Sequence, residues 1–234
     1  MADKTATFVL VHGAWGGSYG WTPLAEEMRR RGHRVFTPSL TGLGERTHLA
    51  HAGVNLSLHI EDVCNVVKYE RLSDFVLVGH SYGGMVVTGV ADRLAGKIRS
   101  LVYVDAFLPE NGKSLFDYTP NDNNGRLNDS GANHGGFFMS SPPQSLVGLT
   151  EEEKALRSPQ PLATCLEKIK LTGAGDSIKN KMYVFAANYS PTPFRQFYDR
   201  VRSQPGWKTS EVNCGHGVHR EKPQELIALL ESMI

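Results

Sequence analysis

The residues best suited to chemistry lie at positions 79–83, where the chain has the sequence GHSYG. A serine hydroxyl attacks poorly unless a nearby base accepts its proton, so Gly-x-Ser-x-Gly indicates nucleophilic catalysis only in the right setting. Here an apolar run at 75–78 precedes the motif and an apolar helical pattern follows it. This setting predicts a sharp strand-to-helix turn, whose glycines allow a strained backbone that exposes the serine. We therefore predict that Ser81 is the nucleophile of an acyl transfer.

A histidine near the C-terminus is the candidate base. His216 follows a predicted strand and a glycine, and it precedes the last predicted helix. His219, three residues later, is the alternative, but His216 lies in the first turn after the strand and is favoured. Two further histidines are expected to be structural: His80 beside the serine, and His12 in the loop after the first strand.

An acid is needed to orient the base and to stabilise its charged form. Asp105 directly follows the apolar strand predicted at 98–104, and a carboxylate buried there is costly unless it has a partner. We predict that Asp105 is this acid; the alternative is that it only begins a turn or caps the following segment. Asp199, within a predicted helix, and Glu221, beyond the histidine, are weaker candidates.

The elements that must position these residues alternate between strand and helix. Because this order predicts an α/β fold with a mostly parallel sheet flanked by helices, residues that follow the strands should converge at one sheet edge. Residues 109–175 break the pattern, being rich in Gly, Asn, Ser and Pro with short helices only near 151–155 and 163–170. We predict a core of residues 1–108 and 176–234, with 109–175 inserted after Asp105 as a lid. The strands are predicted at 8–11, 34–37, 75–78, 98–104, 182–186 and 208–212.

Composition restricts the function classes. The chain has 234 residues and a formal net charge of +1, which argues against binding to nucleic acid or to an anionic membrane. Three cysteines without metal-type spacing predict neither a disulfide framework nor a metal site, and the glycine-rich loops lack nucleotide-binding spacings, so no cofactor is expected. Without a signal peptide or a membrane-spanning run, we expect a cytoplasmic protein with no membrane insertion. The basic residues at 29–31 end a helical pattern and are expected to face solvent.

Taken together, residues 79–83, the His12-Gly13 loop and the run Cys214-Gly215-His216 resemble the α/β-hydrolase superfamily, in particular small plant-type esterases, hydroxynitrile lyases and their bacterial carboxylesterase relatives. The resemblance covers nearly the whole chain. It implies the order serine, acid, histidine, and an oxyanion hole made by the backbone N–H groups of Ala14 and Tyr82. Plant-type members carry the acid after the next-to-last strand. This chain has no carboxylate there, only the amide of Asn188, so we place the acid at Asp105 instead.

Aromatic and apolar residues near the predicted lid suggest an apolar substrate pocket. The predicted reaction is hydrolysis of a small hydrophobic or aromatic carboxylic ester through an acyl-Ser81 intermediate, by a monomer or homodimer. A hydroxynitrile lyase is an alternative, although Gly217 stands where some lyases have a lysine; a lactonase or perhydrolase is another. A non-catalytic receptor for a small ligand is the alternative of a different class. The predicted pocket residues are Trp15, Phe107, Leu108, Phe137 and Phe138.

Overall fold

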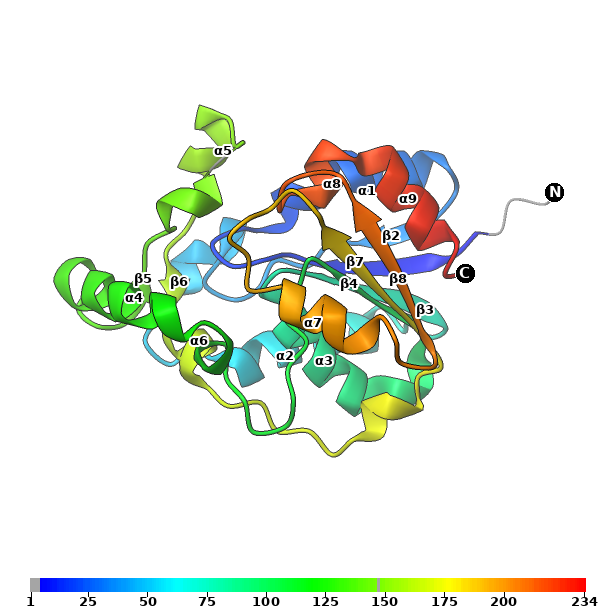
Figure 1. Ribbon diagram of the computed structural model, residues 1–234, viewed down its shortest axis with the longest axis horizontal. Helices are drawn as coiled ribbons and strands as arrows, with labels where there is room; N and C mark the ends of the chain where they lie inside the picture. Colours follow the sequence, from blue (N-terminus) through cyan, green and yellow to red (C-terminus); the bar gives the residue numbers. More distant parts are fainter. Residues whose placement is uncertain (1–4, 147) are drawn as a thin grey trace.

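Six parallel strands form the central sheet of the protein, described here from a computed structural model that covers residues 5–146 and 148–234 (Figure 1). The sheet order is β2-β1-β3-β4-β7-β8, and every neighbouring pair is parallel. The predicted strands and the α/β class are confirmed, with end positions that differ by at most two residues. The strands are β1 (Thr7–Val11), β2 (Arg34–Phe36), β3 (Phe75–His80), β4 (Ile98–Val104), β7 (Asn180–Ala186) and β8 (Trp207–Val212).

The register places the ends of β3 and β4 side by side. His80 pairs with Val104, so the next residue of each strand, Ser81 and Asp105, leaves the sheet at the same level. Both strands are apolar and almost completely buried, as expected for strands covered by helices on both faces. The parallel pairing thus brings the two predicted catalytic groups to one edge.

Helices cover both faces of the sheet and bury two apolar cores (Figure 1). Side chains of β1 alternate between them: Val9 and Val11 face one core, and Phe8 and Leu10 the other. No helix in the described ranges is long and apolar enough to cross a bilayer. The first core contacts α2 (Leu56–Tyr69), α3 (Gly83–Leu94) and α7 (Arg195–Val201), and the second contacts α1 (Thr22–Arg30), α8 (Val218–Glu221) and α9 (Pro223–Glu231).

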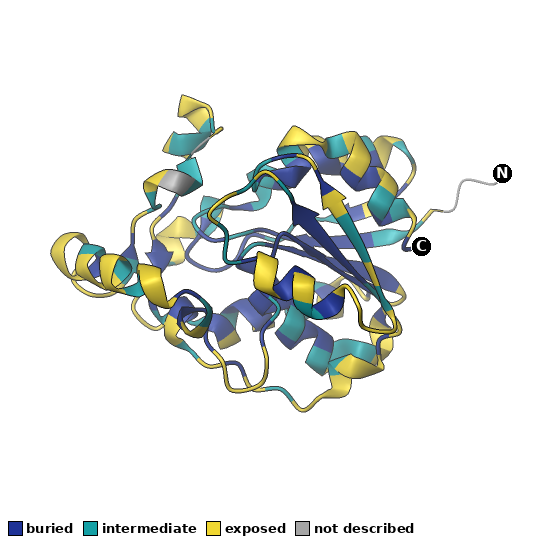
Figure 2. Ribbon diagram, in the orientation of Figure 1, coloured by how far each residue is buried: buried dark blue, intermediate teal, exposed yellow. Residues whose placement is uncertain are grey.

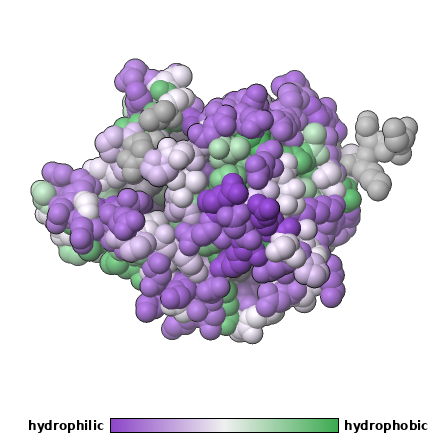
Figure 3. Space-filling model, viewed as in Figure 1, coloured by the Kyte–Doolittle hydropathy of each residue, from purple (hydrophilic) through white to green (hydrophobic). Residues whose placement is uncertain are grey.

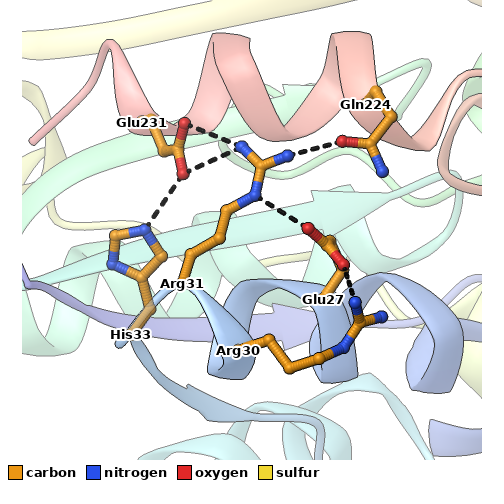
Figure 4. A network of polar contacts seen from close by, with 6 residues as sticks. All are labelled: Glu27, Arg30, Arg31, His33, Gln224 and Glu231. Carbon is orange, nitrogen blue, oxygen red and sulfur yellow. Dashed lines mark hydrogen bonds and ion pairs between the residues drawn. The ribbon is translucent and has the colours of Figure 1, made fainter.

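The basic run at 29–31 is not simply solvated, in contrast to the prediction: Arg29 donates to the carbonyl of Val35 at 2.7 Å, and Arg31 is part of a larger network. Arg31 donates to Glu27 in α1 and to Glu231 and Gln224 in α9, and His33 contacts the same Glu231 (Figure 4). This network links the first and last helices, which are packed on one face of the sheet.

The insert between β4 and β7 lies beside the carboxyl ends of the strands and is mostly exposed (Figures 1 and 2). It contains a helix that the sequence did not predict, α4 (Pro120–Asn133), because that segment has seven Asn or Gly residues and only one buried side chain, Ser130. Pro120 at its start and Asp122 in its first turn favour helix initiation. Helices α4 and α7 present hydrophilic residues to solvent (Figure 3).

The remaining elements are short. In the insert they are β5 (Phe138–Met139), antiparallel to β6 (Gln160–Pro161), with α5 (Glu151–Ala155), α6 (Ala163–Leu166), and the 3-10 turns η4 (Phe116–Tyr118), η5 (Pro143–Leu146) and η6 (Ala174–Ser177). Elsewhere the 3-10 turns are η1 (Ser18–Trp21), η2 (Gly44–Leu49) and η3 (Ala95–Lys97).

Candidate active site

Ser81 lies on a tight turn between β3 and α3. Its φ angle is +55°, in the left-handed region that non-glycine residues rarely adopt. Its carbonyl accepts hydrogen bonds from the N–H groups of Gly84 at 3.0 Å and Phe107 at 3.1 Å. A Cβ on Gly84 would lie 2.0 Å from the carbonyl oxygen of Phe107, so only glycine allows α3 to start this close to the strand end. The strained serine turn predicted from the sequence is present.

Asp105 follows β4 with a φ angle of +42° and no exposed surface. One carboxylate oxygen, Oδ1, accepts a hydrogen bond from the N–H of Ala186 at 3.2 Å. The other, Oδ2, accepts one from Nδ1 of His216 at 2.6 Å. Burial raises the pKa of this carboxyl, and the bond from Ala186 opposes the rise. Asp105 is therefore a partnered buried acid and more than the start of a turn.

His216 lies between aromatic rings and Asp105. The ring of Phe194 stacks on it at 4.9 Å and 7°, and that of Tyr189 at 4.8 Å and 21°. His80 donates from Nε2 to the backbone carbonyl of His216 at 2.9 Å, the structural part predicted for it. Burial, with the positive charge of Arg157, lowers the pKa of His216, which favours the neutral ring that a general base needs.

The residues considered as alternatives for the acid and the base have other partners. His219 is buried against the ring of Trp21, with the centroids 4.5 Å apart. Asp199 is exposed in α7 and pairs with Arg195. Glu221 accepts a hydrogen bond from the N–H of Gly215 at 2.7 Å. Among the candidates, Asp105 is the acid that contacts His216.

The loop after β1 brings a backbone N–H close to the serine. In the described part of the chain, the N–H groups of Ala14 and Tyr82 have no hydrogen-bond acceptor, although both residues line the cavity at Ser81. The loop is held from within by His12, whose Nδ1 donates to the carbonyl of Gly13 and whose Nε2 accepts from Leu40. These two N–H groups are the pair predicted to form an oxyanion hole.

The cavity at Ser81 has two branches that share Ala14, Trp15, Ser81, Ser145 and His216. The large branch, of about 630 Å³, is lined mainly by apolar and aromatic side chains. The small branch, of about 90 Å³, is lined by glycines and apolar side chains and by three charged side chains, those of Glu153, Arg157 and Arg220. Members of the large branch include Phe107, Leu115, Tyr118, Cys165, Tyr189 and Phe194, and those of the small branch include Tyr19, Glu153, Arg157, His219 and Arg220.

Only two of the five predicted pocket residues, Trp15 and Phe107, line the large branch. Leu108 instead lines a separate cavity, and Phe137 is 54% exposed. Phe138 belongs to β5 and lines neither branch in the part of the chain that the structure describes. Alternate side chains of a strand point to opposite faces, and in β5 it is Met139 that is buried in the core, whereas Phe138 is only half-buried.

Several lining residues were missed from the sequence. Tyr189 and Phe194 come from the loop after β7, where only the absence of an acid had been noted. Arg157 comes from a polar part of the insert with no motif around it. In residues 5–146 and 148–234, no group of three or more His, Cys, Asp or Glu side chains is arranged to hold a metal ion.

Comparison with known proteins identifies the family of this chain. Residues 8–229 match the model of the alpha/beta hydrolase family. The chain belongs to this family. It is 41% identical to a carbendazim hydrolyzing esterase from Nocardioides sp. (strain SG-4G), over 97% of this chain and 99% of that protein. It is also 32% identical to methylesterase 10 of Arabidopsis thaliana, over 44% of this chain and 38% of that protein.

The solved structures agree on the fold of this α/β hydrolase. An extracellular alpha/beta-hydrolase from a Paenibacillus species superposes with a TM-score of 0.81 at 24% identity, over 97% of this chain and 98% of that one. The predicted superfamily and α/β-hydrolase fold are thereby confirmed, and so is the prediction of an ester-hydrolysing enzyme, by the full-length similarity to an esterase.

Proposed function

We propose that this α/β hydrolase cleaves carboxylic esters through an acyl intermediate on Ser81. The observation that carries the proposal is the 2.6 Å hydrogen bond from His216 to the buried Asp105, beside a serine held in a strained turn on the same cavity. Such an array activates a hydroxyl that is otherwise a weak nucleophile.

Each residue has one part in the proposed reaction. The neutral ring of His216, held through Nδ1 by Asp105, accepts the Ser81 proton at Nε2 as the hydroxyl attacks the ester carbonyl. The resulting imidazolium then gives that proton to the departing alcohol. A water molecule, deprotonated in the same way, attacks the acyl-serine and releases the carboxylic acid.

The negative charge on the carbonyl oxygen is proposed to be stabilised by the N–H groups of Ala14 and Tyr82. Neither group has an acceptor in residues 5–146 and 148–234, so both are free to donate. The Tyr82 N–H also lies at the start of α3, where the helix dipole favours negative charge. One such donor is typically worth about 10²–10³ in kcat.

The substrate is proposed to carry a hydrophobic or aromatic group. The large branch has the size and the apolar lining for such a group, and insert residues such as Leu115, Tyr118 and Cys165 form part of its wall. We accordingly propose that residues 109–175 act as a lid. The carbendazim-hydrolysing relative makes carbendazim a compound worth testing. A cytoplasmic location and a monomeric or homodimeric state remain predictions.

The test is the turnover of a p-nitrophenyl ester series by the wild type and by Ser81→Ala. We expect kcat to fall by at least about 10⁴-fold in the variant, with an unchanged thermal unfolding temperature. Ser177→Ala, an exposed serine outside the cavity, is the matched control and should retain full activity. Turnover that survives in Ser81→Ala would contradict the nucleophile, and a wild type that binds these esters without hydrolysing them would favour the receptor.

A further inference from the structure

An arginine of the insert projects its charge into the small branch without a carboxylate to balance it. Arg157 donates from Nε to the hydroxyl of Ser141 at 3.0 Å and from Nη2 to that of Ser145 at 3.4 Å. Its guanidinium carbon lies 5.7 Å from the ring centroid of Trp15. Among the described residues no carboxylate lies within ion-pair distance of it. The two serine hydroxyls leave most of its five N–H donors for another partner.

The other charged groups of the small branch do not cancel this charge. Arg220 forms an ion pair with Glu153 at 3.5 Å, so these two neutralise each other. His219 is 9% exposed and also lines the branch, and its Nδ1 has no hydrogen-bond partner within the described ranges. Within the described part of the chain, the small branch therefore has one positive charge without a counter-charge, that of Arg157, and one buried ring nitrogen without a hydrogen-bond partner, Nδ1 of His219.

A partly buried guanidinium without a counter-charge is unfavourable, because it has lost water without gaining an ionic partner. Burial accordingly lowers the pKa of Arg157. The cost would be offset in the complex with a ligand that supplies the missing negative charge, since guanidinium and carboxylate form strong paired hydrogen bonds.

The size of the branch limits what can enter it. Its volume is about 90 Å³, against about 630 Å³ for the large branch. About 10–15 Å³ on this scale is enough for one water molecule, so a group of a few heavy atoms fits, and an aromatic system with substituents does not.

We propose that the small branch binds a short carboxylate-bearing group of the ester substrate through Arg157, while the large branch binds its apolar or aromatic part. This inference rests on the proposed function and narrows its substrate class to esters with a negative charge on one side of the scissile bond. Arg157 is then a specificity-determining residue, and the carboxylate is recognised in the same cavity in which Ser81 attacks.

The test compares charged esters with neutral isosteres in both orientations. Carboxymethyl benzoate against isobutyl benzoate places the charge on the alcohol side, and phenyl hydrogen succinate against phenyl isocaproate places it on the acyl side. We expect the wild type to prefer the charged member of at least one pair by about tenfold or more in kcat/KM, as for hydrogen bonds to charged groups. Uncatalysed hydrolysis is subtracted for each ester.

Three variants test whether Arg157 causes the preference for the charged ester. Arg157→Gln should abolish it while changing kcat/KM for the neutral member by less than about threefold, and Arg157→Lys should retain part of it. Arg93→Gln on α3, which breaks an exposed ion pair with Glu61 of α2, is the matched control and should retain all of it. A wild type that prefers the neutral member of both pairs would overturn the inference, as would an Arg157→Gln variant that loses both members equally.

A binding measurement separates this inference from the proposed function. Malonate should raise the thermal unfolding temperature of Ser81→Ala, and the rise should vanish in the double variant with Arg157→Gln. If neutral esters are hydrolysed but malonate has no such effect, the small branch is not an anion site and only this inference fails. If no ester is hydrolysed but malonate binds through Arg157, the anion site stands and the proposed reaction fails.

Discussion

The edge of the sheet and the insert beside it are held in different ways. At the edge, Asp105 is completely buried and its backbone and carboxylate are bonded to β7 through Val184 and Ala186. The insert packs apolar side chains such as Leu115 and Leu162 into the core and is hydrogen-bonded to Trp15, but about half of its residues are exposed (Figure 2). The groups proposed for chemistry are thus fixed by the main chain of the sheet, whereas those proposed for substrate choice lie partly in an insert that is held by contacts outside the sheet. Changes at the edge should therefore have larger effects on activity than changes in the insert.

The largest effect is expected for Asp105→Asn. Asparagine keeps the size of the side chain and tolerates a positive φ angle, but it cannot stabilise an imidazolium, so kcat should fall by about 10³–10⁴-fold. Asn188→Ala and the exposed Asp199→Asn should remain within about threefold of the wild type. The measurement is ester turnover by variants of matched thermal stability. Near-wild-type turnover by Asp105→Asn, with a large loss in Asn188→Ala, would contradict Asp105 as the acid and would assign the orientation of His216 to Asn188.

An intermediate effect is expected where the insert meets the core. The buried Gln160 accepts a hydrogen bond from the backbone N–H of Trp15 at 3.0 Å and donates to Thr164. Gln160→Leu leaves that N–H without a partner, so the free energy of unfolding should fall by about 1–3 kcal/mol. Because Trp15 adjoins Ala14, we also expect kcat to fall by about tenfold, the effect of a partly misplaced oxyanion donor.

Denaturant unfolding and ester turnover together check this expectation. The exposed Gln196→Leu is the control and should change stability by no more than about 0.5 kcal/mol. A Gln160→Leu variant that loses stability but keeps its full kcat would show that the insert does not help to position the oxyanion loop.

The smallest effect is expected on the pH profile of Arg157→Gln with a neutral ester. His216 acts as a base in its neutral form, so kcat/KM falls as the pH falls through its pKa, which burial and Arg157 together hold below the ordinary value. Removing the positive charge raises that pKa, which moves the acid limb toward neutral pH. We expect the acid limb to move by less than about one pH unit, and the movement should become smaller with added salt.

The pH–rate profile in buffers of constant ionic strength is the measurement. Arg93→Gln should leave the acid limb where it is. An acid limb that moves to lower pH in Arg157→Gln would contradict the electrostatic link between the insert and His216.

Prediction from the sequence succeeded where an apolar run marks a strand and the parallel direction of the strands decides which residues meet at the sheet edge. Apolar runs followed by Ser81 and Asp105 were sufficient to place both residues at strand ends, because parallel strands present their carboxyl ends at one edge. It failed in the insert, where Phe137 and Phe138 were expected in the pocket and α4 was not expected at all. There the chain has few apolar residues to set a period, so contacts distant in sequence decide where each segment lies.

By itself, the sequence determined the class of fold, the strained turn at Ser81 and the identity of the residues near the sheet edge, since strand periodicity and glycine spacing are local properties of the chain. Only the tertiary structure decided which of several carboxylates contacts His216 and where the charge of Arg157 lies. Both depend on distances between segments far apart in sequence: Asp105 and His216 are separated by 111 residues, and the packing of the sheet brings them within 2.6 Å.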